Sequence, residues 1–436
     1  MSDHFSRRNF ISSIGAAGAV SMIACGGKKR YQPGELTLPE QAPDGKVLKA
    51  GLIGCGGRGT GAAINFLNAG PNLEISALGD VFRDRIEQCK NRLMQEKELV
   101  LAEENCFVGF DAFEKVIDSG VDVVILATPP HFRPQHFAAA VNAKKHVFME
   151  KPLAVDPVGI RSIMASAQKA EPFNLSVVTG TQRRHQHSYL TILDLVKQGA
   201  IGDIVAANCY WNQRQLWYRT RKSGWSDMEY MIRDWVNWLW LSGDHIVEQH
   251  IHNIDVINWF TGSHPVKAVG FGGRHRRPTG DQYDFFSVDY IYENGMHMHS
   301  MCRQINGCAD NVSEWIVGSK GTTNCHDKIF KADGSVAWQY PFPTHKEGKV
   351  DRSKIKSPYE QEHINLVTAI RSGNPVNTAK ETAITNLTAI MGRVSAYTGK
   401  QVTWEEMMNS DMRLGPETYE MGAVNISIDI PTPGTA

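Results

Sequence analysis

Two groups of ionisable side chains have the types and spacing that acid–base chemistry needs. In the first, Lys151 follows Glu150 directly after the apolar run 146–149, where a strand of a parallel sheet would end. An ammonium group at such an edge can lower the pKa of a substrate hydroxyl and stabilise the oxyanion that forms as the hydroxyl is oxidised. A surface lysine paired with Glu150 is the alternative, purely structural role.

The second group lies in residues 243–255, which contain three histidines and three acids. On a helix, at about 100° per residue, four of these side chains fall within an arc of roughly 80°, namely His245, Glu248, His252 and Asp255. Three apolar side chains fall on the opposite side, Val247, Ile251 and Ile254. The segment therefore predicts a helix with one ionisable face and one core face. Histidine suits proton transfer because its pKa lies near working pH.

Two other interpretations fit the same face. Two histidines and a carboxylate on one side of a helix can bind zinc or iron, although this spacing fits no standard metal signature. The groups can also be satisfied polar side chains at a domain interface. We prefer the acid–base role and predict no resident metal.

Residues 46–80 have the order of a dinucleotide-binding βαβ unit. An apolar run, 47–53, leads into a glycine turn, a helix-like segment and a second apolar run, 73–78, that stops at Asp80. This is the strand, turn, helix, strand and acid that such a unit requires. The turn residues expected to contact the cofactor are Gly54, Gly56, Gly57, Arg58 and Gly59.

Each part of this unit has a physical role. The glycines permit a tight turn, close approach of the backbone to a pyrophosphate and close packing of the helix, whose N-terminus favours phosphate. Asp80 can accept hydrogen bonds from both ribose hydroxyls and repels a 2′-phosphate, so NAD is favoured over NADP. The apolar strand 121–127 ends in Thr128, Pro129 and His131. We expect these three residues, with Glu150 and Lys151, to complete the cofactor site, because ligands bind at the carboxyl ends of parallel strands.

Several short motifs resemble the Gfo/Idh/MocA oxidoreductases. They are the GCGGRG turn at 54–59, ATPPH at 127–131, EKPLA at 150–154, GTQRRHQ at 180–186, GAIGDI at 199–204 and QEHINLVTAIRSGNPVN at 361–377. The resemblance spans residues 47–405. It implies a second α/β domain with a large, mostly antiparallel sheet, whose outer face mediates contacts between copies in a homo-oligomer.

The resemblance also assigns roles within the two ionisable groups. In that family the lysine of EKP has the role described for Lys151, and an acid precedes a histidine by four residues. Carried over, His252 is the general acid/base, and Glu248 orients it or shares its proton. This sequence departs from the family pattern in two places. Glu248 stands where Asp is commoner, and His250 stands where glycine is usual.

The predicted fold is therefore α/β. A Rossmann-type doubly wound parallel sheet occupies residues 46–181, and the second domain occupies 182–436. Expected strands in the second half are 203–211, 266–272, 285–292, 296–304 and 313–317, and expected helices are 360–372 and 382–398.

Tryptophan is concentrated in one part of the chain. Seven of the ten tryptophans lie between Trp211 and Trp259. Flat rings suit the C–H faces of a pyranose, and interleaved polar groups can bind its hydroxyls. We expect one to three of the rings to touch substrate and the others to be core. The candidate substrate residues are Arg184, His185, Trp211, Arg233, His250 and Asp255.

The charge balance and the N-terminal residues indicate which partners and which cellular location to expect. Lys+Arg and Asp+Glu are both 46, which argues against nucleic acid as a partner. Residues 1–25, with Arg7 and Arg8 before a short, weakly apolar segment, resemble a signal for the twin-arginine export machinery, and that segment is too short to span a membrane. Cys25 follows a loose lipobox and could carry a lipid anchor. Residues 26–45 are predicted to be a linker.

These observations favour an NAD-dependent oxidoreductase that acts on a secondary hydroxyl of a sugar or glycoside, with C3 as a candidate position. A periplasmic location implies that the cofactor is held tightly and is not exchanged in each cycle. The first alternative is a glycoside hydrolase or lyase that uses NAD for transient oxidation followed by elimination. The second is a non-catalytic sugar-binding protein, against which the presence of Lys151, Glu248 and His252 together argues.

Overall fold

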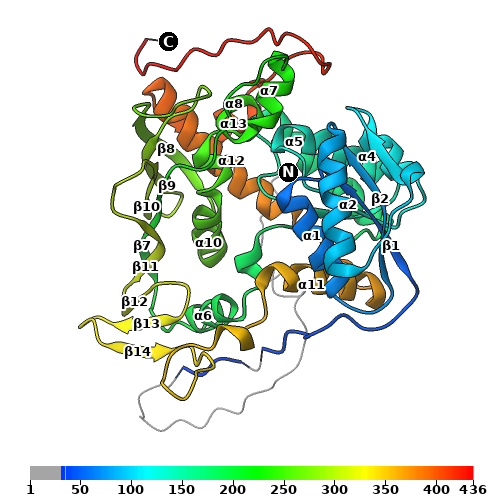
Figure 1. Ribbon diagram of the computed structural model, residues 1–436. Helices are drawn as coiled ribbons and strands as arrows, with labels where there is room; N and C mark the ends of the chain where they lie inside the picture. Colours follow the sequence, from blue (N-terminus) through cyan, green and yellow to red (C-terminus); the bar gives the residue numbers. More distant parts are fainter. Residues whose placement is uncertain (1–30, 35, 436) are drawn as a thin grey trace. The chain divides into compact units, whose positions relative to one another are not determined.

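The computed structural model describes residues 31–34 and 36–435. The predicted export signal at residues 1–25, with Arg7, Arg8 and Cys25, lies outside the described residues. From Pro33 onwards the chain forms one unit that contains two sheets (Figure 1).

The first sheet is the expected doubly wound parallel sheet. Its six strands lie in the order β3-β2-β1-β4-β5-β6, and every neighbouring pair is parallel. Strand β4 is buried along its whole length, which is why its sequence is a continuous apolar run. The elements are β1 (Leu48–Ile53), α1 (Gly57–Asn68), β2 (Leu73–Asp80), α2 (Arg83–Lys97), β3 (Cys106–Val108), α3 (Ala112–Asp118), β4 (Val123–Leu126), α4 (Arg133–Asn142), β5 (His146–Met149), α5 (Pro157–Ala170) and β6 (Val177–Thr179).

The second sheet has nine strands in the order β14-β13-β12-β11-β7-β10-β9-β8-β15. All of its pairs are antiparallel except β7 with β10. Its strands are β7 (Ile204–Gln213), β8 (Pro265–Gly273), β9 (Phe285–Tyr292), β10 (His297–Gln304), β11 (Asn311–Gly318), β12 (Gly321–Thr323), β13 (Lys328–Lys331), β14 (Val336–Gln339) and β15 (Val402–Thr403). The α/β fold with one parallel and one mostly antiparallel sheet is therefore confirmed.

Helices α10 and α12 pack against one face of the nine-stranded sheet (Figure 1). Along β9 and β10 buried side chains alternate with more exposed ones, as a sheet covered on one face requires. The helices of this half of the chain are α6 (His187–Lys197), α7 (Asp227–Arg233), α8 (Leu239–Ser242), α9 (His245–Glu248), α10 (Ile251–Thr261), α11 (Pro358–Ser372), α12 (Ala379–Thr398) and α13 (Trp404–Asn409).

Helix α11 packs against the first domain and not within the second, to which the predicted boundaries assign it. The sequence places it in the second domain, but Ile364, Leu366 and Val367 are fully buried in the hydrophobic core of the first. Helix α11 covers α1 and the end of the parallel sheet at β5 and β6. The first domain is thus completed by a segment that follows the second sheet in the chain.

The end of the predicted linker is held against the folded unit. Gln361 on α11 donates a hydrogen bond to the carbonyl of Pro39 (3.1 Å), and a ring nitrogen of His187 lies 2.7 Å from the carbonyl of Leu36. Ala42 is buried in the core of the first domain. Residues 36–45 therefore belong to the folded unit, because their backbone has specific partners there.

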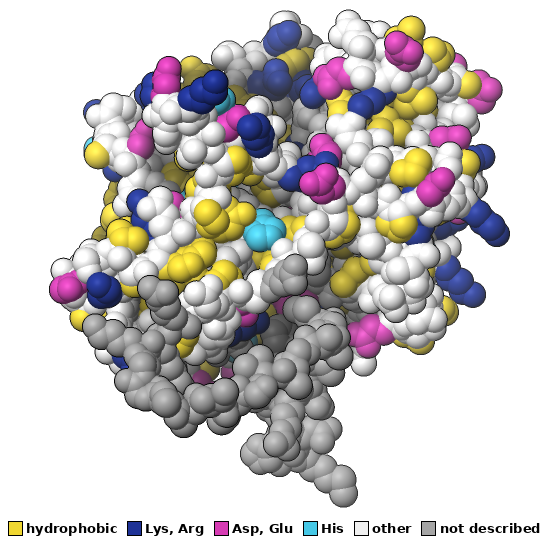
Figure 2. Space-filling model, turned by 90° about the horizontal axis from the view of Figure 1, so that it is seen from below, with side chains coloured by type: hydrophobic (Ala, Val, Ile, Leu, Met, Phe, Trp, Pro, Cys, Tyr) yellow, Lys and Arg dark blue, Asp and Glu magenta, His cyan; other side chains and the backbone are white. Residues whose placement is uncertain are grey.

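Charges of both signs are mixed over the described surface. On the face seen from below, basic and acidic side chains alternate among apolar and uncharged ones (Figure 2). Within the residues that the structure describes, no helix is long and apolar enough to cross a membrane.

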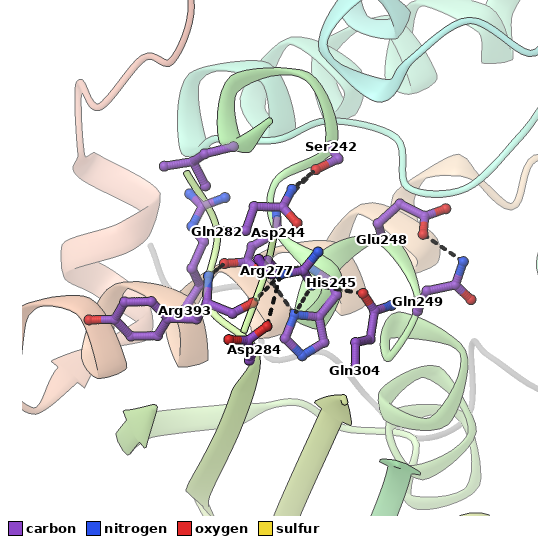
Figure 3. A network of polar contacts seen from close by, with 12 residues as sticks. Ser242, Asp244, His245, Glu248, Gln249, Arg277, Gln282, Asp284, Gln304 and Arg393 are labelled. Carbon is purple, nitrogen blue, oxygen red and sulfur yellow. Dashed lines mark hydrogen bonds and ion pairs between the residues drawn. The ribbon is translucent and has the colours of Figure 1, made fainter. Parts of the chain in front are cut away.

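A buried polar network fixes the start of α9 against the nine-stranded sheet (Figure 3). The Asp244 carboxylate accepts hydrogen bonds from the backbone N–H groups of His245 (2.5 Å) and Tyr283 (2.9 Å) and from the Tyr397 hydroxyl. Burial alone would raise the pKa of Asp244, but its bonds to His245 and the charge of Arg277 hold that pKa below its ordinary value.

The backbone of Asp244 is strained, and the network compensates for the strain. Its φ of 71° with ψ of 161° is a conformation that costs a residue other than glycine about 1–3 kcal/mol. Arg277 links the network to the sheet, since it donates to the carbonyl of Tyr283 (2.6 Å) and to the amide oxygen of Gln304 (2.7 Å). The network therefore sets the direction in which α9 leaves the sheet.

Replacing Asp244 by Asn tests this role. The substitution keeps the shape but removes the charge and presents an NH2 group to existing donors, so the free energy of unfolding should fall by about 3 kcal/mol. The contribution of Asp244 is present above its unfolded pKa of about 3.9 and is lost as pH falls through the lower folded value. Urea unfolding at pH 7 measures the effect, with the exposed Asp310→Asn as control. Equal midpoints for the two variants would contradict the assignment.

Candidate active site

The glycine turn between β1 and α1 has the geometry of a phosphate cradle. Gly54 has a φ of 97°, and a Cβ there would lie 2.6 Å from the backbone of Ala127 and Thr128. A Cβ on Gly59 would lie 1.8 Å from the Gly54 carbonyl oxygen, so this glycine allows α1 to pack on β1. Gly56 and Gly57 instead face open space, where a ligand can approach the first N–H groups of α1.

Asp80 lies at the carboxyl end of β2, beside this cradle. Its two carboxylate oxygens accept hydrogen bonds from the N–H groups of Cys55 (2.7 Å) and Phe82 (2.9 Å). These bonds fix the orientation of the carboxylate and leave lone pairs on both oxygens for ribose hydroxyls. Burial raises the pKa of Asp80, and the two backbone N–H bonds act in the opposite direction.

The cradle and Asp80 line a cavity of about 470 Å³. Thr128 and Pro129 also line it, as predicted, and so does Arg58. Its outer wall comes from the second half of the chain, where the cover segment, residues 217–235, contributes Trp217, Arg219, Ile232, Arg233 and Trp235. The cavity combines a backbone cradle with a carboxylate at a strand end, which fits the pyrophosphate and ribose of NAD.

Several predicted site residues lie elsewhere than expected. Glu150 and Lys151, predicted to complete the cofactor site, do not line this cavity. His131 does not line the cavity, because its ring nitrogen lies 2.7 Å from the Tyr419 hydroxyl and its ring packs edge-on against Trp240. Burial lowers the pKa of His131 to about 3. Arg233, predicted to bind substrate, lies at the cofactor cavity instead. Its guanidinium sits 3.9 Å from the centre of the Phe82 ring and bonds to Asp84.

Arg58 connects the cofactor cavity with the end of β5. Its Nε donates to Glu150 (2.6 Å), and its guanidinium lies 4.8 Å from the centre of the Tyr359 ring. Glu150 is buried, and a Cβ on the neighbouring Gly180 would collide with its carboxylate. The ion pair therefore fixes the glutamate that directly precedes Lys151.

Lys151 bridges the two domains. Its Nζ donates to the backbone carbonyl of Glu248 (2.7 Å) and to the Glu248 carboxylate (3.2 Å). The Gln249 amide donates to the other carboxylate oxygen of Glu248 at 2.6 Å (Figure 3). The ammonium group and the carboxylate are thus held in one position at the carboxyl edge of the parallel sheet.

The bridge depends on a break in the predicted helix. Residues 243–255 form two helices, with α9 ending at Glu248 and α10 beginning at Ile251. The N–H of His252 bonds to the Gln249 carbonyl (3.3 Å), so the Glu248 carbonyl has no partner within the helix and is free for Lys151. The prediction of one continuous ionisable face is therefore wrong.

His252 faces this site from the first turn of α10. Its ring stacks on Trp211 with centroids 5.7 Å apart and planes at 26°, and among the described residues it has no hydrogen-bond partner. Burial lowers the pKa of His252 well below its ordinary value, and the nearby cations Lys151 and Arg183 add to the effect. The ring is therefore neutral near pH 7 and can accept a proton.

The other two histidines of the segment lie in the core. A ring nitrogen of His250 lies 2.7 Å from the Ser300 hydroxyl, with no solvent exposure, so a substrate contact is excluded by burial against β10. His245 lies 2.8 Å from the Asp244 carboxylate, in the network described above. His245 and His252 thus point to different places, and no group of three metal-binding side chains occurs in residues 31–34 and 36–435.

Arg184 and Asp255 form a brace between the turn after β6 and α10, while His185 of the same turn contacts α11. Arg184 makes two 2.8 Å hydrogen bonds to Asp255, which also accepts from the Thr385 hydroxyl. His185 lies 2.7 Å from the Asn365 amide. All three are predicted substrate residues. Arg184 and Asp255 are bonded to protein partners and position α10, whereas Nε2 of His185 is buried without a partner. Trp211 is the predicted substrate residue that contacts His252.

Three residues at the cofactor cavity were not predicted from the sequence, namely Phe82, Trp217 and Trp235. The cluster of tryptophans suggests sugar binding, yet Trp217 and Trp235 line the cofactor cavity. Phe82, two residues after Asp80, is the ring on which Arg233 rests. An aromatic residue close to the acid of a βαβ unit is the local signal that could have indicated a clamp there.

Comparisons with known proteins agree with the fold and with an NAD-binding first domain. A family model described as an oxidoreductase family with an NAD-binding Rossmann fold matches residues 48–177, and one for the GFO/IDH/MocA C-terminal domain matches residues 189–324. Myo-inositol 2-dehydrogenase of Thermotoga maritima is 29% identical over 155 residues, which is 36% of this chain and 42% of that protein. The NAD(+)-dependent scyllo-inositol 2-dehydrogenase of Bacillus subtilis is 23% identical over 66% of this chain and 78% of its own length.

A solved structure shares the fold over most of the chain. The scyllo-inositol dehydrogenase of Lactobacillus casei, solved with NAD(H) and scyllo-inositol, has a TM-score of 0.61 at 21% identity. The match covers 82% of this chain and 99% of that structure. Both halves of the chain, each with its own family model, therefore place it in the Gfo/Idh/MocA family of NAD-binding oxidoreductases.

Proposed function

We propose that this protein oxidises and reduces a secondary hydroxyl of a sugar or glycoside, with C3 as the candidate position, and that it keeps its NAD bound throughout. The observation that carries the proposal is the neutral, unpartnered ring of His252 beside the bridge between Lys151 and Glu248. Relatives named as inositol dehydrogenases support a ring-shaped polyol as the type of substrate.

The roles of the residues follow from charge and position. NAD, when bound in the cavity, supplies the acceptor for hydride from the carbon that carries the hydroxyl. Lys151 places a cation beside that hydroxyl and favours the oxyanion form. His252 accepts the hydroxyl proton on oxidation and returns it on reduction. Glu248 holds the ammonium of Lys151 in place and partly neutralises it.

The cover segment supports a resident cofactor. Arg233 spans from the second half of the chain to Phe82 and Asp84, while Trp217 and Trp235 pack against each other at 6.3 Å over the same cavity. Residues after β7 thereby form part of the wall of the cavity. A cofactor that stays bound requires a reaction without net change in NAD, so a second carbonyl compound is reduced in a later half-reaction.

We further propose that the chain is exported by the twin-arginine machinery to the periplasm, which Arg7 and Arg8 support, and that it forms a homo-oligomer. The face of the nine-stranded sheet opposite α10 and α12 exposes Val269, Phe271 and Met301, whose exposed fractions are 48%, 66% and 36%. Val269 and Phe271 lie on β8 and Met301 lies on β10, with β9 between them, and Phe271 and Met301 are both in register with Ser287. Such a group of exposed apolar side chains suits a contact between copies. Cell fractionation tests the location, and sedimentation of the purified protein tests the assembly.

The proposed activity is tested without added cofactor. Purified protein should release NAD on denaturation, and addition of the substrate sugar alone should produce the absorbance band of bound NADH. A panel of sugars and glycosides identifies the substrate. Lys151→Ala should slow the change by about 10²–10⁴-fold, because the oxyanion loses its cation. Lys145→Ala, at the opposite end of β5, is the matched control and should retain full rates.

The same experiment separates the alternatives. Release of free sugar from a glycoside without lasting NADH would replace this proposal by hydrolysis or elimination through transient oxidation. Absence of nucleotide from the purified protein, together with unchanged sugar binding in Lys151→Ala, would instead indicate a non-catalytic sugar-binding protein.

The pH dependence tests the role of His252. A lowered pKa keeps the base form present as pH falls, so kcat/KM for NADH formation should stay level through about 6.5, the ordinary value for histidine, and fall only below it. His252→Ala should lose this acid limb together with most of the rate, and added imidazole should restore part of the rate. A limb centred at or above 6.5 would refute the assignment of His252 as the base.

Retention of the cofactor depends on Arg233 in this proposal. Arg233→Ala removes the contact with Phe82 and the ion pair with Asp84, so we expect NAD to dissociate about tenfold faster or more. Displacement of bound NADH, followed by its fluorescence, measures the rate. Arg221→Ala removes an exposed arginine of the same segment that does not line the cavity, and its rate should match the wild type.

A further inference from the structure

Residues 411–435, which follow α13, form an extended segment that contacts both halves of the chain, and we call this segment the strap. In Figure 1 it is the red trace that passes α7. Near its start the N–H of Leu414 donates to the Asp156 carboxylate (2.9 Å), at the beginning of α5 in the first domain. Near its end the carbonyl of Pro431 accepts a hydrogen bond from the Tyr283 hydroxyl (2.6 Å), just before β9. The strap is therefore anchored at both ends, once in each half.

Between these anchors the strap packs against the cover segment. The N–H of Met228, in the first turn of α7, donates to the Gly422 carbonyl (3.1 Å). One hydrophobic cluster joins Phe82 with side chains of the cover segment, among them Met228, Met231 and Ile232, and with four side chains of the strap, Leu414, Tyr419, Val424 and Ile426. Phe82 and Ile232 also line the cofactor cavity. The strap thus packs in the same cluster as two residues of the cavity wall.

The strap also contacts the loop after β4, beside the cavity. The Tyr419 hydroxyl lies 2.7 Å from Nε2 of His131, and the Tyr419 ring packs edge-on against Phe132, with centroids 5.4 Å apart. Phe132 lines the cavity. Gly415 has a φ of 95°, and a Cβ there would lie 2.7 Å from the His131 ring, so a glycine permits this close approach. His131, predicted from the sequence to bind the cofactor, instead receives the strap.

The cover segment depends on such packing for its position. Its longest regular element is α7, which has seven residues. A helix of that length is not stable on its own in water. The apolar side chains of α7 are therefore held by their neighbours in the cluster, which include Phe82 of the first domain and the four side chains of the strap.

We infer that the strap fixes the cover segment against bound NAD, and that the protein keeps its cofactor only while the strap is docked. The inference rests on the proposed function, in which NAD is resident. Tyr419, Val424 and Ile426 act through the cover segment and the loop after β4, so they are positioning residues. The strap lies outside the residues that the two family models match, 48–177 and 189–324, and the retention of NAD is accordingly a property of this chain's own sequence.

The test compares two double variants of the strap that lose similar apolar side chains. Val424→Ser with Ile426→Ser removes two side chains that pack in the cluster. Ile428→Ser with Ile430→Ser is the matched control, because these side chains are 52% and 42% exposed. NADH should dissociate from the first double variant at least about tenfold faster than from the wild type, and from the control at the wild-type rate. Displacement of bound NADH, followed by its fluorescence, measures the rates.

A second measurement separates retention of the cofactor from folding. After desalting, the wild type and the control should still contain NAD, and the first double variant should have lost it. Added NADH should rebind to the first double variant in the calorimeter with one site per chain, because the glycine turn and Asp80 are unchanged. If this variant does not fold, Val424→Ala is compared with Ile428→Ala in the same two measurements.

Each other result has a defined meaning. Equal dissociation rates in the two double variants, whether unchanged or raised, would overturn the role of the strap and leave the proposed oxidation standing. A folded first double variant that does not rebind NADH would show that the strap builds the cavity and does not act in retention, which also overturns the inference. Wild-type protein that is purified without nucleotide would contradict the resident cofactor of the proposed function itself.

Discussion

The contact between the Lys151 ammonium and Glu248 is the constraint on which the site depends. One partner ends a strand of the parallel sheet, and the other ends a short helix of the second half of the chain. A continuous helix would have used the Glu248 carbonyl for its own hydrogen bond, and Lys151 would have lost its shorter contact. Because α9 and α10 are separate helices, the Glu248 carbonyl oxygen can accept the hydrogen bond from Lys151 that joins the two halves.

Strain and buried charge maintain that break. Asp244 adopts a backbone conformation that is unfavourable for its residue type, and it does so within hydrogen bonds from two backbone N–H groups and a tyrosine. Farther along, the ion pair of Arg184 and Asp255 ties α10 to the turn after β6. His252 lies between these two fixed points, and its ring is left without a partner of its own. Rigid surroundings thereby leave an unpartnered imidazole close to the Lys151 ammonium.

Local pattern was enough to predict the longer strands and the glycine turn and Asp80 that line the cofactor cavity. The boundaries of β5 and β9 agree with the apolar runs 146–149 and 285–292, since strands covered by protein need such runs. The short strands β12, β13, β14 and β15 were not foreseen, because two to four residues carry too little periodicity. Helical periodicity also predicted a continuous helix through Gln249 and His250, where the structure has a break between α9 and α10. Hydrogen bonds from residues distant in the sequence determine the backbone conformation there. The predicted substrate contacts of His250 and Arg233 were wrong for the same reason. Residue type does not reveal which neighbours the tertiary structure places beside a side chain.

The position of α11 has a consequence for how the chain acquires its cofactor. Ile364, Leu366 and Val367 complete the core around β1 and α1, yet they follow the whole nine-stranded sheet in the sequence. During synthesis the nucleotide-binding half consequently lacks part of its interior until more than four fifths of the polypeptide has left the ribosome. The interior beside the nucleotide cavity is therefore completed only after the nine-stranded sheet has been synthesised.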